Sequence, residues 1–275
     1  MENSFEDAVL PVTSVTSGEI QEAAQGIHCL PVQIVNVVFA DNGSEGWVLI
    51  DAGMPRSAEV ILREAEHRYG SAKPEAIVLT HGHFDHVGAI VDLVEHWQVP
   101  VYAHELELPY LTGERDYPPA DPAVDEGWIA KLSPLFPNAG IDLKPHVRPL
   151  PADGTVPGLK DWRWIHTPGH TPGHVSLFRE SDRCLVAGDA FVTVKQESLY
   201  KVVLQELELN GPPKYFTTDW SAAWESVKKL AALQPAIAVT GHGRPIRGEE
   251  LNRALGELAE RFDELAIPSE GRFVH

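Results

Sequence analysis

A short stretch of the sequence, residues 80–86, limits the fold of the chain more than any other feature. It is crowded with side chains that can bind metal ions: His81, His83, Asp85 and His86. An apolar run at 76–79 leads into it, and a second apolar run at 87–94 has helical spacing. This pattern predicts a buried strand that ends in a ligand-rich loop and is followed directly by a helix. We expect the loop to hold one or two metal ions, because His and Asp gain little from crowding at a strand end unless something binds there.

Hydrophobic periodicity along the rest of the chain predicts strands and helices in two similar passes. The expected strands are 27–40, 46–50, 76–79, 100–103, 161–165, 174–178, 183–187 and 236–239. The expected helices are 57–69, 87–94, a third that begins after Asp219, and a fourth whose buried stripe is Leu251, Leu255, Leu258, Phe262 and Leu265. No repeat and no clear linker divides the sequence, and residues 1–25 are polar. We therefore expect one α/β domain over residues 1–275 that starts with a tail or entry loop.

Two stretches lack this regularity. Nine of the 22 prolines lie between Pro109 and Pro151, and a short helical piece at 128–135 is the main periodic pattern there. The aromatic residues of the two stretches are Tyr110, Tyr117, Trp128, Phe136, Phe191, Tyr200, Tyr215 and Phe216. Residues 105–151 are too many for an ordinary connection, so they predict a Pro-rich insertion that forms a lid or rim. The alternative is an excursion that only packs on the surface.

Composition narrows the partners. The chain has 22 Lys and Arg against 40 Asp and Glu, a net charge of −18, which disfavours binding to nucleic acid or to an anionic membrane. No run of apolar residues is long enough to span a bilayer, and the first residues lack the pattern of a signal peptide. Cys29 and Cys184 lie in apolar runs and are expected to be core residues. We expect a cytoplasmic protein with a small-molecule substrate. The sequence leaves open whether the chain forms a homodimer.

Three further strand ends carry residues of the same kind as the first loop. The segments that follow these strands contain His166, His170 and His174, then Asp189, and finally His242. His170 is the preferred ligand of its segment, because Pro-Gly and Thr-Pro turns on either side hold it rigidly. Any one of these pieces is weak evidence, but four strand ends with metal ligands are unlikely to be accidental. His104 also follows a strand, and whether it faces the site stays open.

The run His81-x-His83-x-Asp85-His86, followed by His170, Asp189 and His242, resembles the metallo-β-lactamase superfamily of hydrolases. The resemblance covers the chain from about Val48 to His242 and implies an αββα four-layer sandwich with two metal ions at one edge. It implies that His81, His83 and His170 hold one ion, that Asp85, His86 and His242 hold the other, and that Asp189 bridges them. Asp51 matches a characteristic strand end of the superfamily and is expected to support a ligand.

Departures from particular members of the superfamily restrict the function further. β-Lactamases carry a cysteine where this chain has Asp189, and flavodiiron proteins carry a glutamate where it has His83. Glyoxalase II has a sizeable helical region after the last ligand, whereas little more than one helix follows His242 here. Several acyl-homoserine lactonases place a tyrosine where this chain has Val192. The sequence therefore does not single out the substrate of any of these four classes of protein.

A donor set of five histidines and two aspartates suits zinc first, with iron or manganese as alternatives. Two divalent ions would turn a shared water into a metal-bound hydroxide, and Asp85 would both bind metal and orient or accept the proton. We expect hydrolysis of a small ester, thioester or lactone, and Arg244 is a candidate contact for an anionic group. The alternatives are an iron-dependent oxidoreductase of the persulfide-dioxygenase type, a phosphodiesterase, and a non-catalytic binding protein on the same fold.

Overall fold

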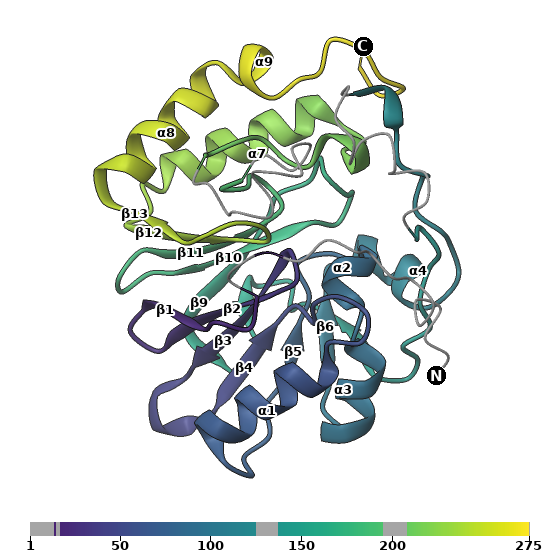
Figure 1. Ribbon diagram of the computed structural model, residues 1–275, viewed down its shortest axis with the longest axis vertical. Helices are drawn as coiled ribbons and strands as arrows, with labels where there is room; N and C mark the ends of the chain where they lie inside the picture. Colours follow the sequence, from purple (N-terminus) through teal and green to yellow (C-terminus); the bar gives the residue numbers. More distant parts are fainter. Residues whose placement is uncertain (1–13, 15–16, 125–136, 195–207, 275) are drawn as a thin grey trace.

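Two β-sheets face each other, and helices cover the outer face of each (Figure 1). The structure, a computed structural model, describes residues 14, 17–124, 137–194 and 208–274. Helices α1 (Ala58–Tyr69) and α3 (Ile90–Trp97) lie on one sheet, and helices α7 (Trp220–Ala232) and α8 (Gly248–Glu260) lie on the other. The predicted αββα sandwich is therefore confirmed.

The first sheet follows the order of the chain. Its strands are β1 (Gln21–Ala24), β2 (Ile27–Val32), β3 (Val35–Asp41), β4 (Trp47–Ile50), β5 (Ile77–Val78), β6 (Val101–Ala103) and β7 (Val147–Pro149). β1 to β4 are antiparallel, and β4 to β7 are parallel. The single strand predicted at 27–40 is wrong, because the chain turns at Gln33, whose φ is 58°. The tail predicted at 1–25 is wrong where β1 forms.

The second sheet has the strand order β13-β12-β11-β10-β9-β8. Its strands are β8 (Thr155–Val156), β9 (Leu159–His166), β10 (Val175–Arg179), β11 (Cys184–Gly188), β12 (Ile237–Thr240) and β13 (Ile246–Arg247). β11 and β12 are parallel, and the other neighbours are antiparallel. Because β11 and β12 run in the same direction, the residues that follow them emerge at the same edge of the sheet.

Alternation along the strands divides the core into layers. Val38 pairs with Ile50, which pairs with Val78, and all three face the second sheet. Their neighbours face outward and pack under α1 and α3. Cys29 and Cys184 are both buried free thiols between the sheets, as expected, and burial raises the pKa of each to about 12. Among the described residues, no helix is both long and apolar enough to span a bilayer.

The predicted helix at 87–94 is two helices, α2 (Phe84–Val87) and α3, which are separated at Gly88. A Cβ atom on Gly88 would lie 2.1 Å from Pro55 N and 2.3 Å from the carbonyl carbon of Met54, so only glycine fits. The predicted N-cap Asp219 is confirmed, since its side chain accepts from Ala222 N at 2.9 Å. The prediction that Leu265 belongs to the buried stripe of the last helix is wrong, since Leu265 is 43% exposed. The cause is that α8 has already ended and a separate turn, α9 (Phe262–Leu265), has begun.

Replacing Gly88 with alanine is expected to lower the free energy of unfolding by about 3 kcal/mol, since the added methyl meets backbone atoms that cannot rotate away. Gly256, inside α8, is a matched control because nothing lies within 4 Å of the position of its Cβ. Gly256→Ala should leave stability unchanged or raise it by up to about 1 kcal/mol. Urea unfolding of the two variants measures both values, and equal stabilities would show that the Gly88 contact is not restrictive.

The described part of 105–151 packs into the molecule. It contains the short helical turns η2 (Glu105–Glu107), α4 (Leu108–Leu111) and η3 (Pro122–Val124), and it ends in β7. Leu111, Ile141 and Leu143 are buried in the same core as α1 and α3. The prediction of a lid is not confirmed, and the helical piece at 128–135 lies outside the described residues. The remaining turns of the described chain are η1 (Gly43–Glu45) and η5 (Lys214–Phe216).

Candidate metal centre

The loops that follow β5, β9, β11 and β12 meet at one edge of the sandwich. Backbone hydrogen bonds join these loops: Val175 N donates to Thr80 O at 2.9 Å, and Gly241 N donates to Gly188 O at 2.8 Å. The first of these bonds links the two sheets, and the second links neighbouring strand ends of one sheet. Every ligand predicted from the sequence lies on these loops or on α2, the helix directly after the β5 loop.

Three histidines form one group of potential ligands. The ring centroids of His81, His83 and His170 lie 4.7 to 4.9 Å apart, and the ring planes are close to perpendicular, at 81° to 87°. His83 Nδ1 and His170 Nε2 are 3.0 Å apart. Three imidazoles in this arrangement direct one nitrogen each toward a common point. The sequence placed two of them on one loop and the third 87 residues later.

Asp85, His86 and His242 form a second group. Their ligand atoms lie within 4.8 Å of one another, and Asp85 Oδ2 is 3.4 Å from His242 Nε2. α2 presents Asp85 and His86 together, because its first turn follows the β5 loop without a break. His242 reaches the group from the end of β12.

Asp189 lies between the two groups. Its Oδ2 atom is 3.5 Å from the Nε2 atoms of both His86 and His170, and 3.3 Å from His242 Nε2. One carboxylate oxygen is therefore within reach of both groups. The structure brings together all seven residues that the sequence singled out: His81, His83, Asp85, His86, His170, Asp189 and His242.

Asp51 supports His86 from behind. Its Oδ2 accepts from His86 Nδ1 at 2.8 Å and from Thr80 Oγ1 at 2.8 Å, and its Oδ1 accepts from Thr80 N at 2.7 Å. A carboxylate accepts hydrogen bonds, so it places the proton of His86 on Nδ1 and leaves Nε2 free to bind a metal. Asp51 therefore occupies the supporting position that the resemblance implied, and it does so with a φ of 62°.

The first sheet supports His242 in the same way. His242 Nδ1 lies 2.8 Å from Ile34 O, and a carbonyl can only accept, so Nε2 is again the nitrogen turned inward. Asn36 holds the loop itself, because its Nδ2 donates to Thr240 O at 2.8 Å and to Gly243 O at 2.7 Å. The sequence analysis did not identify Asn36. No local pattern marks it, since its partners lie more than 200 residues away.

His174 is a second residue whose role the sequence did not reveal. Its Nε2 accepts from Asp189 N at 2.9 Å, and its Nδ1 lies 2.9 Å from Thr167 Oγ1. The same Thr167 Oγ1 atom lies 3.0 Å from Ser176 Oγ, and Ser176 Oγ donates to Ala187 O at 2.8 Å. The carbonyl at the end fixes the direction of the whole chain of hydrogen bonds and leaves His174 Nε2 as an acceptor. Burial lowers the pKa of His174 to about 3, so it stays neutral and orients Asp189.

The chemistry of the cluster fits a divalent cation. Three buried polar atoms of the cluster make no hydrogen bond to any described residue: His81 Nε2, His86 Nε2 and Asp189 Oδ1. Buried polar atoms without partners cost free energy, and proteins rarely leave several of them in one place. A cation bound by these atoms would satisfy all three. Imidazole nitrogens with carboxylate oxygens suit zinc, iron or manganese.

The histidines of the two groups differ in the direction in which their pKa values are shifted. Burial lowers the pKa of each ring in the first group, to about 4 for His83, so these rings are neutral donors. Burial acts in the same direction on His242, but Asp189 and Asp85 outweigh it and raise its pKa to about 10. For His86, burial is likewise outweighed by Asp189 and Asp51, which raise its pKa well above its usual value. The second group therefore favours positive charge, whether a proton or a metal ion supplies it.

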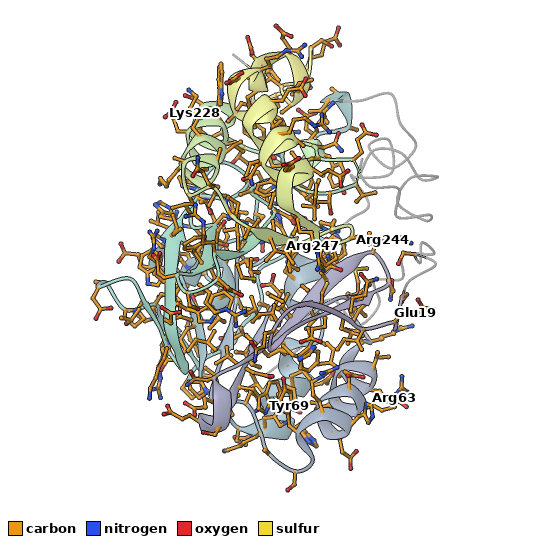
Figure 2. All side chains as sticks on the ribbon, turned by 90° about the vertical axis from the view of Figure 1, so that its left-hand side faces the viewer. Glu19, Arg63, Tyr69, Lys228, Arg244 and Arg247 are labelled. Carbon is orange, nitrogen blue, oxygen red and sulfur yellow. The ribbon has the colours of Figure 1, made fainter. Side chains whose placement is uncertain are left out.

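Three further residues that the sequence singled out, His104, Arg244 and Phe191, lie outside the three ligand groups. His104 is not part of the three ligand groups; its ring stacks on His166 with centroids 4.2 Å apart, and its Nδ1 accepts from Leu106 N. Arg244 is exposed, and Figure 2 shows it midway between α1 and α8. Phe191 is fully buried under α7, so it is a core residue.

Two aromatic residues reach the centre. The rings of Tyr117 and Phe216 each lie with their centroids 4.6 Å from that of His83. Both side chains are buried, so they form a wall behind His83. Of the other aromatic residues in the two irregular stretches, three lie outside the described part of the chain: Trp128, Phe136 and Tyr200.

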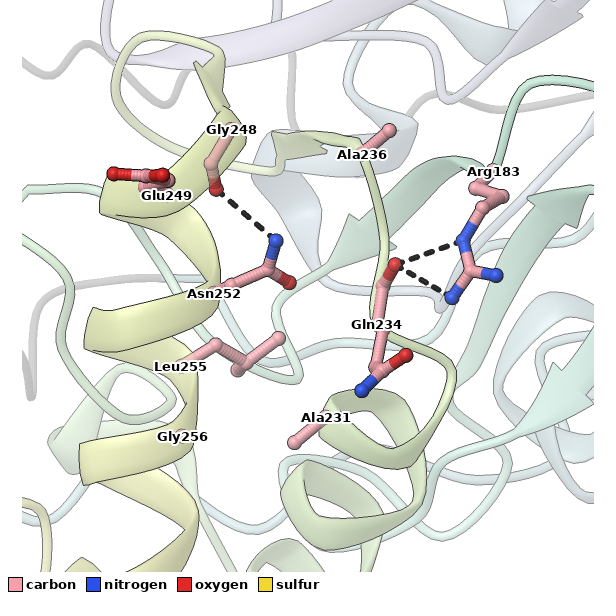
Figure 3. Close-up of a pocket in the computed structure, with 9 residues that line it drawn as sticks. All are labelled: Arg183, Ala231, Gln234, Ala236, Gly248, Glu249, Asn252, Leu255 and Gly256. Carbon is pink, nitrogen blue, oxygen red and sulfur yellow. Dashed lines mark hydrogen bonds between the residues drawn. The ribbon is translucent and has the colours of Figure 1, made fainter.

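A surface pocket of about 710 Å³ lies away from this cluster, between α7 and α8 (Figure 3). None of the seven predicted ligands lines it. Two of its polar side chains already bond to nearby backbone: Arg183 donates to Gln234 O, and Asn252 donates to Gly248 O. The strand-end cluster is therefore the better candidate for a catalytic site.

Comparison with known proteins agrees with this geometry. A family model described as the metallo-beta-lactamase superfamily matches residues 30–242. A Bacillus subtilis protein named "Probable metallo-hydrolase YflN" is 55% identical over 262 residues, which cover 94% of this chain and 99% of the relative. A solved structure, TTHA1623 in a di-iron-bound form, is 29% identical with a TM-score of 0.55, covering 82% of this chain and 92% of that one.

A B3 metallo-beta-lactamase with an active-site glutamic acid is 22% identical, with a TM-score of 0.59, and the match covers 92% of this chain and 89% of that one. At this identity the likeness bears on the fold alone. It agrees with the layered arrangement of Figure 1.

Proposed function

The chain belongs to the metallo-beta-lactamase superfamily and is a metallo-hydrolase of it, and we propose that it hydrolyses a small ester, thioester or lactone with two divalent ions. The observation that carries the proposal is the position of Asp189. Its Oδ2 atom contacts the first group through His170 and the second through His86 and His242. A shared carboxylate of this kind is what two neighbouring metal ions require.

In this proposal His81, His83 and His170 hold one ion, Asp85, His86 and His242 hold the other, and Asp189 bridges them. When bound, two divalent ions held by these residues would supply an acidified water as nucleophile and would polarise the scissile carbonyl. The protein's own contribution is to fix the ligands: Asp51, Ile34 and His174 set the orientation of His86, His242 and Asp189. Zinc is the proposed metal, with iron or manganese as alternatives.

Asp85 is the proposed proton acceptor. Its side chain is 12% exposed, whereas that of Asp189 is 2% exposed, so Asp85 is the carboxylate of the cluster that substrate can approach. Burial favours its neutral form, but His86 and His242 outweigh burial and lower the pKa of Asp85. Asp85 is therefore ionised at neutral pH and able to take a proton.

The preference for an acyl substrate rests on several supporting observations. Asp189 stands where β-lactamases carry a cysteine, and the net charge of −18 disfavours polyanionic substrates. Tyr117 and Phe216 lie against His83, so the surroundings of the first group are partly apolar, which suits a small, partly apolar molecule. Arg244 is exposed two residues after His242 and is the proposed contact for an anionic part of the substrate.

A substrate panel tests this proposal. Esters, thioesters, lactones and phosphodiesters would be assayed with the zinc-loaded protein and with chelator-treated protein as the control. Turnover of at least one acyl class, lost on chelation and restored by zinc, is expected. Turnover of phosphodiesters alone would overturn the acyl assignment and favour the phosphodiesterase alternative.

Iron chemistry is a second candidate, because the relative at 29% identity is described in a di-iron-bound form. The persulfide-dioxygenase alternative uses a single iron. The second group, with Asp85 and His242 only 3.4 Å apart, favours two ions over one. Oxygen consumption with a thiol persulfide, together with one iron per chain, would replace the hydrolase proposal.

A further inference from the structure

Glu107 is a completely buried carboxylate that lies outside the seven proposed ligands. It is the last residue of η2, in the stretch where the sequence indicated a lid. Four groups donate hydrogen bonds to its two oxygens, two to each. Burying a carboxylate costs free energy unless such donors surround it, so the burial of Glu107 depends on these four hydrogen bonds.

Three of the four donors come from the two loops that follow β5 and β9, which are the ligand loops of the first group. Oε2 accepts from Gly82 N at 3.0 Å and from the hydroxyl of Tyr117. Oε1 accepts from Thr171 Oγ1 at 2.8 Å and from Gly173 N at 2.8 Å. Gly82 lies between His81 and His83, and Thr171 directly follows His170. One carboxylate therefore joins the two loops that supply all three rings of the first group.

The glycines of these loops fit the same arrangement. A Cβ atom on Gly82 would lie 2.5 Å from the hydroxyl oxygen of Tyr117, and one on Gly173 would lie 2.8 Å from Glu107 Cγ. Neither glycine has a positive φ, so close approach explains them better than backbone conformation does. Gly173 therefore makes room for the Glu107 side chain itself, and Gly82 makes room for the Tyr117 hydroxyl that donates to Glu107.

We propose that Glu107 is a positioning residue that sets the separation of the β5 and β9 loops and thereby the geometry of the three-histidine metal site. The proposal rests on the metal centre of the proposed function. A carboxylate suits this task because all four partners donate and none has to accept. A glutamine of the same shape would keep one loop on its carbonyl oxygen and turn its NH₂ group toward a backbone N–H of the other.

The test is Glu107→Gln, measured by competition with a chromophoric chelator for zinc. We expect two ions per chain in the parent and affinity for one of them lowered about 10- to 100-fold in the variant, the scale typical of residues that orient metal ligands. In metal-free protein, amide hydrogen exchange at Gly82 or Gly173 should be faster. Unchanged zinc affinity and unchanged exchange at both amides would overturn the proposal.

Asp121→Asn is a matched control. Asp121 is also buried, and it accepts from Ala123 N at 3.1 Å and from Arg272 N, away from both ligand loops. We expect this variant to bind both zinc ions as the parent does, even where it melts at a lower temperature. Equal losses of zinc affinity in the two variants would show that general destabilisation explains the effect, and would overturn the proposal.

Thr171→Val is the second variant in case Glu107→Gln does not fold. It removes a single donor to Oε1 and retains the carboxylate. An affinity for one ion lowered about 10-fold supports the proposal, and a value equal to that of the parent overturns it. The proposed function fails separately: a parent that binds fewer than two ions contradicts the metal centre, while exchange at Gly82 and Gly173 still decides the role of Glu107.

Discussion

Asp189→Asn is expected to lower kcat by about 10³-fold or more on a substrate identified by the proposed panel, the scale seen when one essential active-site group is removed. The Oδ2 atom lies 3.3 to 3.5 Å from the inward nitrogens of three histidines, so it is the only described carboxylate oxygen with contacts to both groups. Asparagine keeps the shape but removes the negative charge and presents an NH₂ donor. Steady-state kinetics with excess zinc measures the loss.

Asp182→Asn is the control for this prediction. Asp182 precedes β11, whereas Asp189 follows it, so the two aspartates lie at opposite ends of one strand. Asp182 bonds to Arg179 at the surface and should tolerate the change with kcat within about twofold of the parent. An Asp189→Asn protein that kept more than about a tenth of the parent's kcat would show that catalysis does not depend on a bridging carboxylate.

Removal of metal is expected to lower the melting temperature by about 10 °C or more. One ion at a free concentration ~1,000 times its Kd adds about 4 kcal/mol of stability, and a chain of similar size shifts by about 2–4 °C per kcal/mol. Chelation returns His81 Nε2, His86 Nε2 and Asp189 Oδ1 to a buried state without hydrogen-bond partners. Differential scanning calorimetry with and without chelator measures the shift.

Bound protons offset part of the stability that is lost when metal is removed. Asp189 and Asp85 raise the pKa of His242 to about 10 despite its burial, so a proton can replace some of the charge that a metal ion supplies. Re-addition of zinc should restore the melting temperature of the parent, and Asp189→Asn should recover less. A shift of less than about 2 °C on chelation of the parent would contradict a buried two-ion centre.

The sequence predicted that the seven candidate ligands lie together because they follow strands, and strand ends of both sheets converge on one edge. Asp189 and His242 each come directly after an apolar strand that periodicity detects. The supporting residues could not be found in this way. Glu107 and Asn36 act across the sandwich on loops far away in sequence, so nothing in their immediate neighbours distinguishes them from surface or turn residues.

The errors in the fold have similar causes. The hairpin between β2 and β3 turns at Gln33, which is neither glycine nor proline, so the apolar run from 27 to 40 conceals the turn. The break at Gly88 depends on the approach of Met54 and Pro55, a tertiary contact that helical periodicity does not report. Leu265 continues the periodicity of α8, although that helix has already ended at Glu260.

The number of metal ions bound per chain tests the proposed centre most directly. Elemental analysis of the purified parent, after removal of loosely bound ions, is expected to give two ions per chain. His83→Ala and His242→Ala, each of which removes a ligand from one group only, should each retain about one. A parent that binds a single ion, with all seven ligands intact, would contradict the two-ion centre and the bridging role of Asp189.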